Sequence, residues 1–280
     1  MTGIKYRVFI YPAYGEKTFF PSEYAHFSLG KKGTAIQFSL EKPVFRILRS
    51  PLQCLNCAAQ SPRLYINIHS HNAPSSNEWV IQNLHSHWEK AALPGRFSIG
   101  IHPWYIEDDG QEQFRELKQW STHQHVLAIG ECGLDKVCST DFSLQQVVFV
   151  QQILLANAIQ KPLIIHCVRA WEEMFSLLKK SENKVPVIFH GFAKNTALAS
   201  RITSNGYYIS FGKALQQQRV REMLQHIPTV RLFLETDDAA LSIETVYDLA
   251  ASALSIDHNS LSLQLQQNAV TVFGTAIFQP

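Results

Sequence analysis

The sequence has little net charge, few cysteines and no long apolar run. Its 280 residues carry 25 lysines and arginines against 23 aspartates and glutamates, a net charge of +2. So small an excess does not by itself indicate nucleic-acid binding, nor does it exclude a nuclease, whose metal ions attract phosphate. No uninterrupted apolar run approaches the ~18 residues of a membrane span, and no basic-then-apolar secretory signal opens the chain. We therefore expect a cytoplasmic protein with no membrane partner.

The cysteines are few and odd in number: Cys54, Cys57, Cys132, Cys138 and Cys167. Without a secretory signal, an odd count argues against a disulfide framework. Cys54 and Cys57 form a lone C-x-x-C pair, a spacing found in zinc sites and in redox sites. No second pair at zinc-finger spacing accompanies it, which disfavours a zinc finger.

From residue 64 onward, short apolar runs alternate with amphipathic stretches, the pattern of βα units. This pattern predicts eight strands, at 64–69, 78–84, 97–101, 126–130, 162–166, 186–190, 207–211 and 231–235. It predicts helices at 111–122, 143–159, 170–180, 196–205, 216–225, 243–254 and 260–273. The expected fold is α/β, a TIM-type (β/α)8 barrel. It should be somewhat irregular, because the first two connections are too short for full helices.

Residues 1–62 do not follow this rhythm, and we predict an N-terminal extension to a barrel formed by residues 63–280. The extension is rich in aromatic residues and interrupted by prolines. Tyr6–Tyr11 and Thr34–Leu40 are candidate strands of a small β element. A poorly ordered extension, or a start codon assigned too far upstream, are alternatives that the sequence leaves open.

Five of the predicted strands end in side chains that can bind a metal ion. These side chains are His69, His71, Glu131, His166, His190 and Asp237. Because the carboxyl ends of the strands of a parallel barrel meet at one mouth, we expect one site. Four imidazoles and two carboxylates suit zinc, manganese, iron or nickel better than calcium, which prefers oxygen donors alone.

Each of these side chains has a plainer interpretation when it is taken alone. His69 and His71 share one face of a strand, so both can reach one ion, but an isolated H-x-H is also a common pair of surface histidines. His166 and His190 finish apolar strands, where a histidine is often a satisfied core residue. Glu131 is, taken alone, an acidic residue that begins a loop. The metal site is therefore predicted from all of them together.

Several segments match one family in the family's own order. They are INIHSH (66–71), SIGIHPW (98–104), AIGECGLD (128–135), PLIIHCVRA (162–170), VIFHGF (187–192), LFLETD (232–237) and QQNAVTVFG (266–274). On these motifs the chain resembles the TatD-related metal-dependent hydrolases, a branch of the amidohydrolase-like superfamily, from about residue 64 to its end. The family usually has aspartate where this chain has Asn67, and the N-terminal extension is not a family feature.

The resemblance implies a hydrolase that uses two divalent ions, drawn from zinc, manganese, magnesium, iron and nickel. On this reading the catalytic residues are Asp237, which would orient the attacking water or take its proton, and Glu131. We expect phosphodiester hydrolysis by a deoxyribonuclease of the exonuclease type, with a nucleic acid as substrate and no obligate protein partner. The implied ligands are His69, His71 and Asp237 for one ion, His166 and His190 for the other, and Glu131 as the bridge between them.

Substrate contacts are predicted around this centre. Arg169 follows the fifth strand, where a guanidinium can grip a phosphate; a surface pair with Glu172 or Glu173 is the alternative. His102 is a second candidate for substrate binding. Trp104 either stacks on a base or simply packs in the fold. Three lysines follow the fourth, sixth and seventh strands and would also rim the mouth, although each taken alone is more often a solvated loop lysine: Lys136, Lys194 and Lys213.

Two other functions remain open from the sequence. The first is a metal-dependent ester or amide hydrolase, such as an aminoacyl-tRNA deacylase, which needs fewer basic groups at its mouth than a nuclease. The second is a binding barrel with weakened catalysis, for which Asn67 is the only support, because an amide carries no charge toward the metal ligands.

Overall fold

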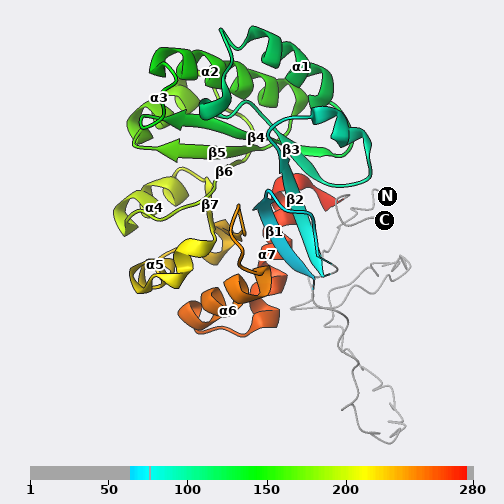
Figure 1. Cartoon of the computed structure of the whole chain (residues 1–280). Helices are drawn as coiled ribbons and strands as arrows, with labels where there is room; N and C mark the ends of the chain where they lie inside the picture. The colour runs from blue at the N-terminus through cyan, green and yellow to red at the C-terminus, as the bar shows by residue number, and fades with distance from the viewer. Residues whose placement is uncertain (1–63, 76, 276–280) are drawn as a thin grey trace, which may run out of the picture. The chain divides into compact units, whose positions relative to one another are not determined.

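The computed structural model describes residues 64–75 and 77–275. The predicted N-terminal extension, with its two candidate strands and its C-x-x-C pair, lies outside these residues. The described chain forms one sheet of eight parallel strands in sequence order, with helices around it (Figure 1). The strands are β1 (Tyr65–Ser70), β2 (Glu78–Leu84), β3 (Phe97–Ile99), β4 (Val126–Asp135), β5 (Leu163–Val168), β6 (Val187–Phe189), β7 (Tyr208–Phe211) and β8 (Leu232–Leu234). The predicted (β/α)8 barrel is confirmed.

The helices agree with the predicted positions to within a few residues. They are α1 (Gln111–Ser121), α2 (Phe142–Ile159), α3 (Trp171–Lys180), α4 (Thr196–Ser204), α5 (Gln218–Leu224), α6 (Ile243–Leu254) and α7 (His258–Phe273). The predicted irregularity is present as well, since the connection from β2 to β3 carries only the 3-10 helix η1 (Trp88–Ala92). The other short 3-10 helices are η2 (Pro103–Tyr105), η3 (Lys213–Gln216) and η4 (Thr229–Arg231).

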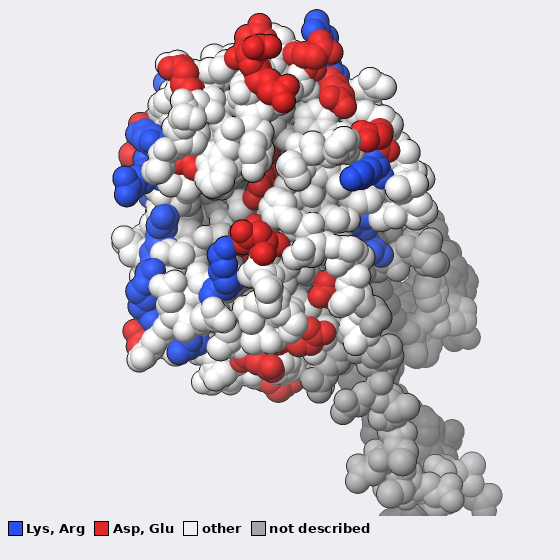
Figure 2. Space-filling model, viewed as in Figure 1, with Lys and Arg blue, Asp and Glu red and all other residues white. Residues whose placement is uncertain are grey.

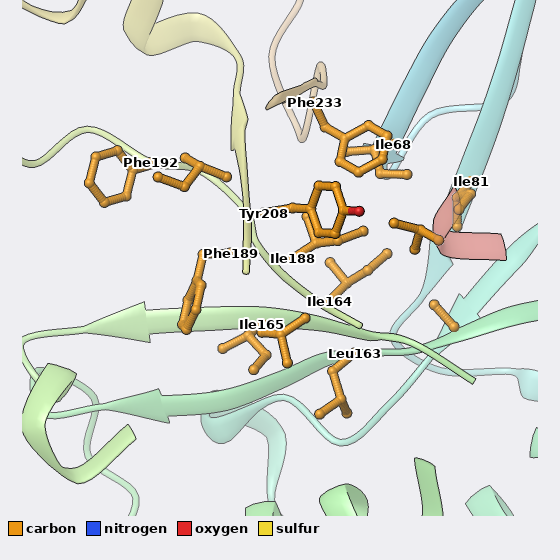
Figure 3. Packing of buried hydrophobic residues seen from close by; sticks show 14 of the residues in the cluster. Ile68, Ile81, Leu163, Ile164, Ile165, Ile188, Phe189, Phe192, Tyr208 and Phe233 are labelled. Atoms are coloured by element: carbon orange, nitrogen blue, oxygen red, sulfur yellow. The ribbon is translucent and has the colours of Figure 1, made fainter. Parts of the chain in front are cut away.

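Alternation along the strands separates the barrel interior from the layer under the helices. Figure 3 shows Ile164 and Ile188 beside Tyr208 among the strands, while Leu163 and Phe189 point to the other side of their strands. All five are buried. The side chains that follow at the mouth end of the barrel are also buried but polar, and include Asn67, His69, Asn83, Ser98, Glu131, Ser210 and Glu235. The barrel therefore has an apolar floor below a polar mouth.

Two glycines let β4 lie unusually close to β5. A Cβ on Gly130 would lie 2.6 Å from the carbonyl oxygen of Ile164, and one on Gly133 would lie 2.0 Å from that of His166. Gly133 also has a φ of 141°, which side-chain-bearing residues rarely adopt. The strand β4 continues to Asp135, where the sequence pattern predicted an end at residue 130. The additional residues of β4 follow Glu131 and pair with β5, where Gly133 lies opposite His166.

The barrel closes at its mouth where β1 meets the residues that follow β8. The N–H of His71 donates to the carbonyl of Asp237 at 3.0 Å, and the N–H of Asp237 donates to that of His69 at 3.1 Å. These bonds form a parallel bridge between Ser70 and Asp237. The seam of the barrel therefore places the H-x-H pair directly beside Asp237.

One helix is more apolar than the sequence analysis anticipated. By length and mean hydropathy, 1.3, α2 could cross a membrane, and it alone among the helices of the described residues meets both criteria. Its buried glutamines are however bonded to the barrel. Gln152 exchanges two hydrogen bonds with the backbone of Ile101, at 2.8 and 3.0 Å, and Gln145 binds both backbone groups of Asp135. In this fold α2 belongs to the outer helical layer.

Candidate metal centre

Glu131 is the hub of the polar mouth. Its Oε1 lies 3.0 Å from Nε2 of His69 and 2.9 Å from Nε2 of His190. Its Oε2 lies 3.9 Å from Nε2 of His71 and also 3.9 Å from Nε2 of His102. Residues from β1, from β4 and from the ends of β3 and β6 thus meet at one carboxylate, as the convergence of strand ends predicted.

Asp237 completes one compact group of donor atoms. Its Oδ1 lies 3.6 Å from Nε2 of His69 and 3.5 Å from Nε2 of His71. The donor atoms of these three residues and Glu131 all lie within 4.8 Å of one another. The arrangement matches the set predicted for the first ion together with its bridging carboxylate.

The second predicted set is arranged differently. His166 and His190 lie near each other, with ring centroids 5.7 Å apart. Each belongs to its own group of donor atoms within 4.8 Å, however: His102, Glu131 and His166 form one group, and His190, Glu235 and Asp237 form the other. The structure brings all six predicted ligands to one place, while the sharing of one ion by His166 and His190 stays a prediction.

The buried histidines of this mouth fit a bound cation. Nδ1 of His69 and Nδ1 of His190 are buried with no hydrogen-bond partner among the described residues, while Nε2 of each lies beside Glu131 without meeting it in hydrogen-bond geometry. A buried polar atom without a partner is costly, and such atoms in native proteins usually have a function or an unseen ligand. Imidazole and carboxylate donors together suit zinc, manganese, iron or nickel. The residues present therefore fit divalent metal binding.

The charges in the centre are strongly coupled. Burial alone would raise the pKa of Glu131, but the neighbouring His190 and His69 outweigh it and hold the pKa well below its usual value. Burial lowers the pKa of His69, but the charge of Glu131 and the contacts with Asp237 and Glu131 together outweigh it and raise the pKa to about 9. Burial also lowers the pKa of His190, but Glu131 and Glu235 together outweigh it and hold the pKa well above its usual value. Without metal these histidines carry protons, which a cation would have to displace.

His102 is buried and faces the centre as a hydrogen-bond donor. The backbone N–H of Trp104 donates to its Nδ1 at 3.1 Å. Burial and the nearby His166 lower the pKa of His102 to about 3, so the ring is neutral. A neutral imidazole with an acceptor at Nδ1 carries its proton on Nε2, the atom that faces Glu131. A protonated Nε2 can donate to a substrate oxygen but cannot bind an ion, which favours the predicted substrate role over metal ligation.

The basic residues around the mouth are only partly available to a phosphate. Glu172 pairs with Arg201 and Glu173 pairs with Lys136, so neither is the partner of Arg169 that the alternative interpretation proposed. Arg169 is exposed and makes no ion pair within the described chain. Its binding of phosphate stays a prediction. Lys213 pairs with Asp238 at 2.6 Å, and Lys194 is exposed.

Glu235 is a site residue that the sequence analysis missed. It is 1% exposed, and its Oε1 accepts a hydrogen bond from the N–H of Gly191 at 2.7 Å. The same oxygen lies 3.8 Å from Nδ1 of His190, and Oε2 is buried without a partner among the described residues. The signal was present in the motif LFLETD, where Glu235 is the first acidic residue after an apolar strand.

Asn83 also escaped notice. Its Oδ1 accepts the backbone N–H of Glu131 at 3.0 Å and the hydroxyl of Ser98 at 3.1 Å. The asparagine thus fixes the backbone at the hub carboxylate. No pattern in the sequence points to it, since β2 carries no motif of its own.

A cavity of about 390 Å³ adjoins the centre on the side of β6, β7 and β8. Figure 2 shows a hollow in this face with acidic side chains inside it, and lysines and arginines along the edge that α3, α4 and α5 occupy in Figure 1. The hollow thus has an acidic interior, which suits bound cations, and basic side chains lie along one edge of the same face. The cavity is lined by Gly191, Ala193, Gly212, Lys213, Ala214, Gln216, Gln217, Glu235 and Asp237.

Comparison with known families gives a match over most of the chain. Residues 53–274 match the family described as TatD related DNase. An uncharacterized metal-dependent hydrolase of Buchnera aphidicola is 33% identical over 150 residues, which cover 52% of this chain and 56% of the relative. The uncharacterized metal-dependent hydrolase YabD of Bacillus subtilis is 34% identical over 145 residues, or 50% of this chain and 57% of the relative.

A third relative carries a more specific name. The protein named 3'-5' ssDNA/RNA exonuclease TatD in Edwardsiella piscicida is 32% identical over 148 residues, which cover 50% of this chain and 56% of the relative. The chain thus spans a little more than half the length of these curated relatives.

Solved structures support the fold. The TatD homolog YJJV of Escherichia coli superposes with a TM-score of 0.66 at 22% identity, covering 75% of this chain and 98% of that one. A TatD family hydrolase from Entamoeba histolytica gives a TM-score of 0.64 at 18% identity, with the same coverage of both chains. At these identities the likeness supports the barrel and no further property.

Proposed function

The chain belongs to the TatD-related DNase family of metal-dependent hydrolases, and from this premise we propose that it is a phosphodiesterase, a deoxyribonuclease of the exonuclease type. The observation that carries the proposal is the position of Glu131, whose Oε1 lies 2.9 and 3.0 Å from two buried imidazole nitrogens. A relative named as a single-strand exonuclease supports the choice of a nucleic acid as substrate.

His69, His71, Glu131 and Asp237 would hold one divalent ion, with His166 and His190 contributing to a second. Bound there, the ions would supply the chemistry that a phosphodiester needs, a lowered pKa of water and compensation of charge on the phosphoryl oxygens.

The protein's own residues would place the substrate and handle its protons. Burial raises the pKa of Asp237, but the contact with His69 and the charges of His190 and His69 together outweigh this and lower it, so the carboxylate is ionised at neutral pH and can accept a proton. The Nε2–H of His102 would donate to a non-bridging phosphoryl oxygen. The exposed guanidinium of Arg169 would bind a phosphate farther along the strand.

The test is a nuclease assay on the full chain after metal removal and reconstitution with zinc, manganese, magnesium, iron or nickel in turn. Single-stranded DNA, duplex DNA and RNA, each labelled at one end, report both the substrate and the direction of cleavage. Glu131→Gln keeps the shape of the side chain without its charge, and we expect the loss of at least 100-fold in kcat. Glu172→Gln, on the outer face of α3, is the matched control. Unchanged turnover in Glu131→Gln would contradict the proposal.

One observation favours ester hydrolysis as a second candidate. Lys136 and Lys213, two of the lysines expected to rim the mouth, are paired with Glu173 and Asp238. Fewer free cations remain for a phosphate chain than a nuclease would use. The same reconstituted protein should therefore be assayed on an aminoacyl ester of tRNA, and faster turnover of the ester than of any phosphodiester would select this candidate.

A further inference from the structure

Trp104 is an exposed side chain that the fold holds in a fixed position. It belongs to η2, directly after β3, and 54% of its surface is exposed. Its indole Nε1–H donates to Oδ2 of Asp135 at 2.6 Å. Since Asp135 is 2% exposed, a freely accessible ring is anchored to a buried carboxylate. Part of the ring therefore packs on the fold while about half of its surface stays exposed.

The anchor of Trp104 is itself rigid and touches the metal centre. Gln145 of α2 binds both backbone groups of Asp135, at 2.8 and 3.0 Å. The side-chain Oδ2 that accepts the indole N–H also lies 3.2 Å from Nε2 of His166. Oδ2 of Asp135 thus lies between the indole and the predicted ligand His166. The ring centroids of Trp104 and His166 are 6.1 Å apart.

The faces of the indole are not stacked on other rings of the described chain. Its aromatic neighbours are His102, Tyr105 and His166, with interplanar angles of 87°, 77° and 76°. All three contacts are therefore T-shaped, and none of them is stacked. Tyr105, 50% exposed, and Val137, 61% exposed, add apolar surface at the same rim, and the N–H of Val137 is held by the other oxygen of Asp135.

We propose that Trp104 is a stacking platform for one unpaired nucleobase next to the scissile phosphate, with Asp135 as its positioning residue. This inference rests on the proposed phosphodiesterase function, which supplies a substrate with a flat apolar group one sugar away from each phosphate. A base within a duplex has both faces covered by its neighbours, so the platform selects unpaired ends. Stacking on an aromatic side chain is tolerant of base identity, and the fixed indole loses little freedom when the base arrives.

The decisive experiment combines the removal of the Trp104 side chain with the removal of the base that it would contact, as in a double-mutant cycle. The metal-loaded full chain, Trp104→Ala and Trp104→Phe are compared on a short single-stranded oligonucleotide and on the same oligonucleotide with abasic residues at the last two positions. We expect Trp104→Ala to raise KM on the intact strand by roughly tenfold or more, with kcat much less affected. Trp104→Phe should restore part of the loss. On the abasic strand all three proteins should have similar KM values.

A merely structural role of Trp104 predicts a different result. Loss of the indole would then impair both oligonucleotides equally, and such equal losses would overturn the inference. An unchanged KM on the intact strand would overturn it too. Val147→Ala, at an exposed apolar position on α2, is the matched control. Circular dichroism and thermal unfolding show whether each variant is folded, and Trp104→Phe keeps the test informative if Trp104→Ala is not.

A binding measurement separates this inference from the proposed function. The probe is a phosphorothioate oligonucleotide that resists hydrolysis and carries 2-aminopurine at its terminal position. Quenching of 2-aminopurine by the wild type but not by Trp104→Ala supports the platform even if no nucleic acid is cleaved. Hydrolysis with quenching that does not depend on Trp104 would leave the function standing and refute the platform.

Discussion

Asn67 holds Thr236 with both ends of its amide, across the seam where the barrel closes. Its Oδ1 accepts the backbone N–H of Thr236 at 3.1 Å, and its Nδ2 donates to the hydroxyl at 2.9 Å. That hydroxyl donates in turn to Ser70 at 3.0 Å, whose own hydroxyl reaches the carbonyl of Asp237 at 3.4 Å. The amide thus directs a chain of hydrogen bonds that ends at the backbone of a predicted ligand.

This arrangement gives Asn67 a structural role that an uncharged side chain performs well. Asn67→Ala would remove both amide contacts of Thr236 in a buried seam and leave its N–H with only the longer bond to the carbonyl of His69, at 3.3 Å, which should lower the free energy of unfolding by about 1–3 kcal/mol. We expect metal affinity to fall as well, because Asp237 loses its support. Chemical denaturation and metal titration by calorimetry would measure the two effects.

The conservative variants sharpen that prediction. Asn67→Asp can accept from both groups of Thr236 but cannot donate, so it should keep most of the stability lost in Asn67→Ala. Thr236→Ser retains every bond, whereas Thr236→Val loses the hydroxyl. A large rise in turnover for Asn67→Asp would instead mean that the natural amide weakens the centre.

Glu235 should support metal binding through His190. Glu235→Ala would leave the N–H of Gly191 without its acceptor and remove the carboxylate 3.8 Å from Nδ1 of His190. Loss of such a partner of a ligating histidine typically weakens metal binding or activity by about 10–100-fold. Competition with a chromogenic chelator would measure this, with Glu235→Gln, which keeps an acceptor for Gly191, as the control. If Glu235→Ala bound metal as tightly as the wild type, metal binding by His190 would not depend on the carboxylate of Glu235.

The metal-free protein should lose stability as the pH rises through about 9. The pKa of His69 is raised from 6.5 to about 9, so its proton stabilises the folded state fully below pH 6.5, and this contribution disappears as the pH passes through 9. His190 acts in the same direction. Lys161 opposes them, because burial lowers its pKa to about 8 and its stability contribution improves with rising pH.

The histidine effect is isolated by comparing the wild type with Glu131→Gln, which lacks the charge that raises both histidine pKa values. Thermal unfolding in the presence of a chelator should show a steeper fall between pH 7 and 10 for the wild type. Metal affinity should rise over the same interval, since fewer protons must be displaced. Parallel curves for the two proteins would contradict the assignment of these charges to Glu131.

The sequence predicted those features of the centre that are carried by local patterns. All eight strands followed from short apolar runs, and five of these runs stop at the histidines and carboxylates that the sequence predicted as ligands. The supporting contacts did not follow, because they join residues from different strands. Asn83 meets the N–H of Glu131 across 48 positions of the chain, and Asp135 meets Trp104 across 31. The proton position of His102 depends on a local contact, the hydrogen bond from the N–H of Trp104. The residue types alone do not reveal it, because it depends on the backbone geometry.

The close approach of β4 and β5 should make Gly133 indispensable for the centre. In Gly133→Ala the new Cβ would lie 2.0 Å from the carbonyl oxygen of His166, which requires the two strands to separate. We expect a loss of about 3 kcal/mol or more in the free energy of unfolding, and a weaker second metal site because His166 moves. Gly206→Ala is the matched control, since Gly206 also has a positive φ, 82°, but nothing lies within 4 Å of the added Cβ. It should cost only about 1 kcal/mol. Denaturant titration of both variants separates steric overlap from backbone strain. If both lost the same free energy of unfolding, the close contact between β4 and β5 would not be what makes Gly133 important.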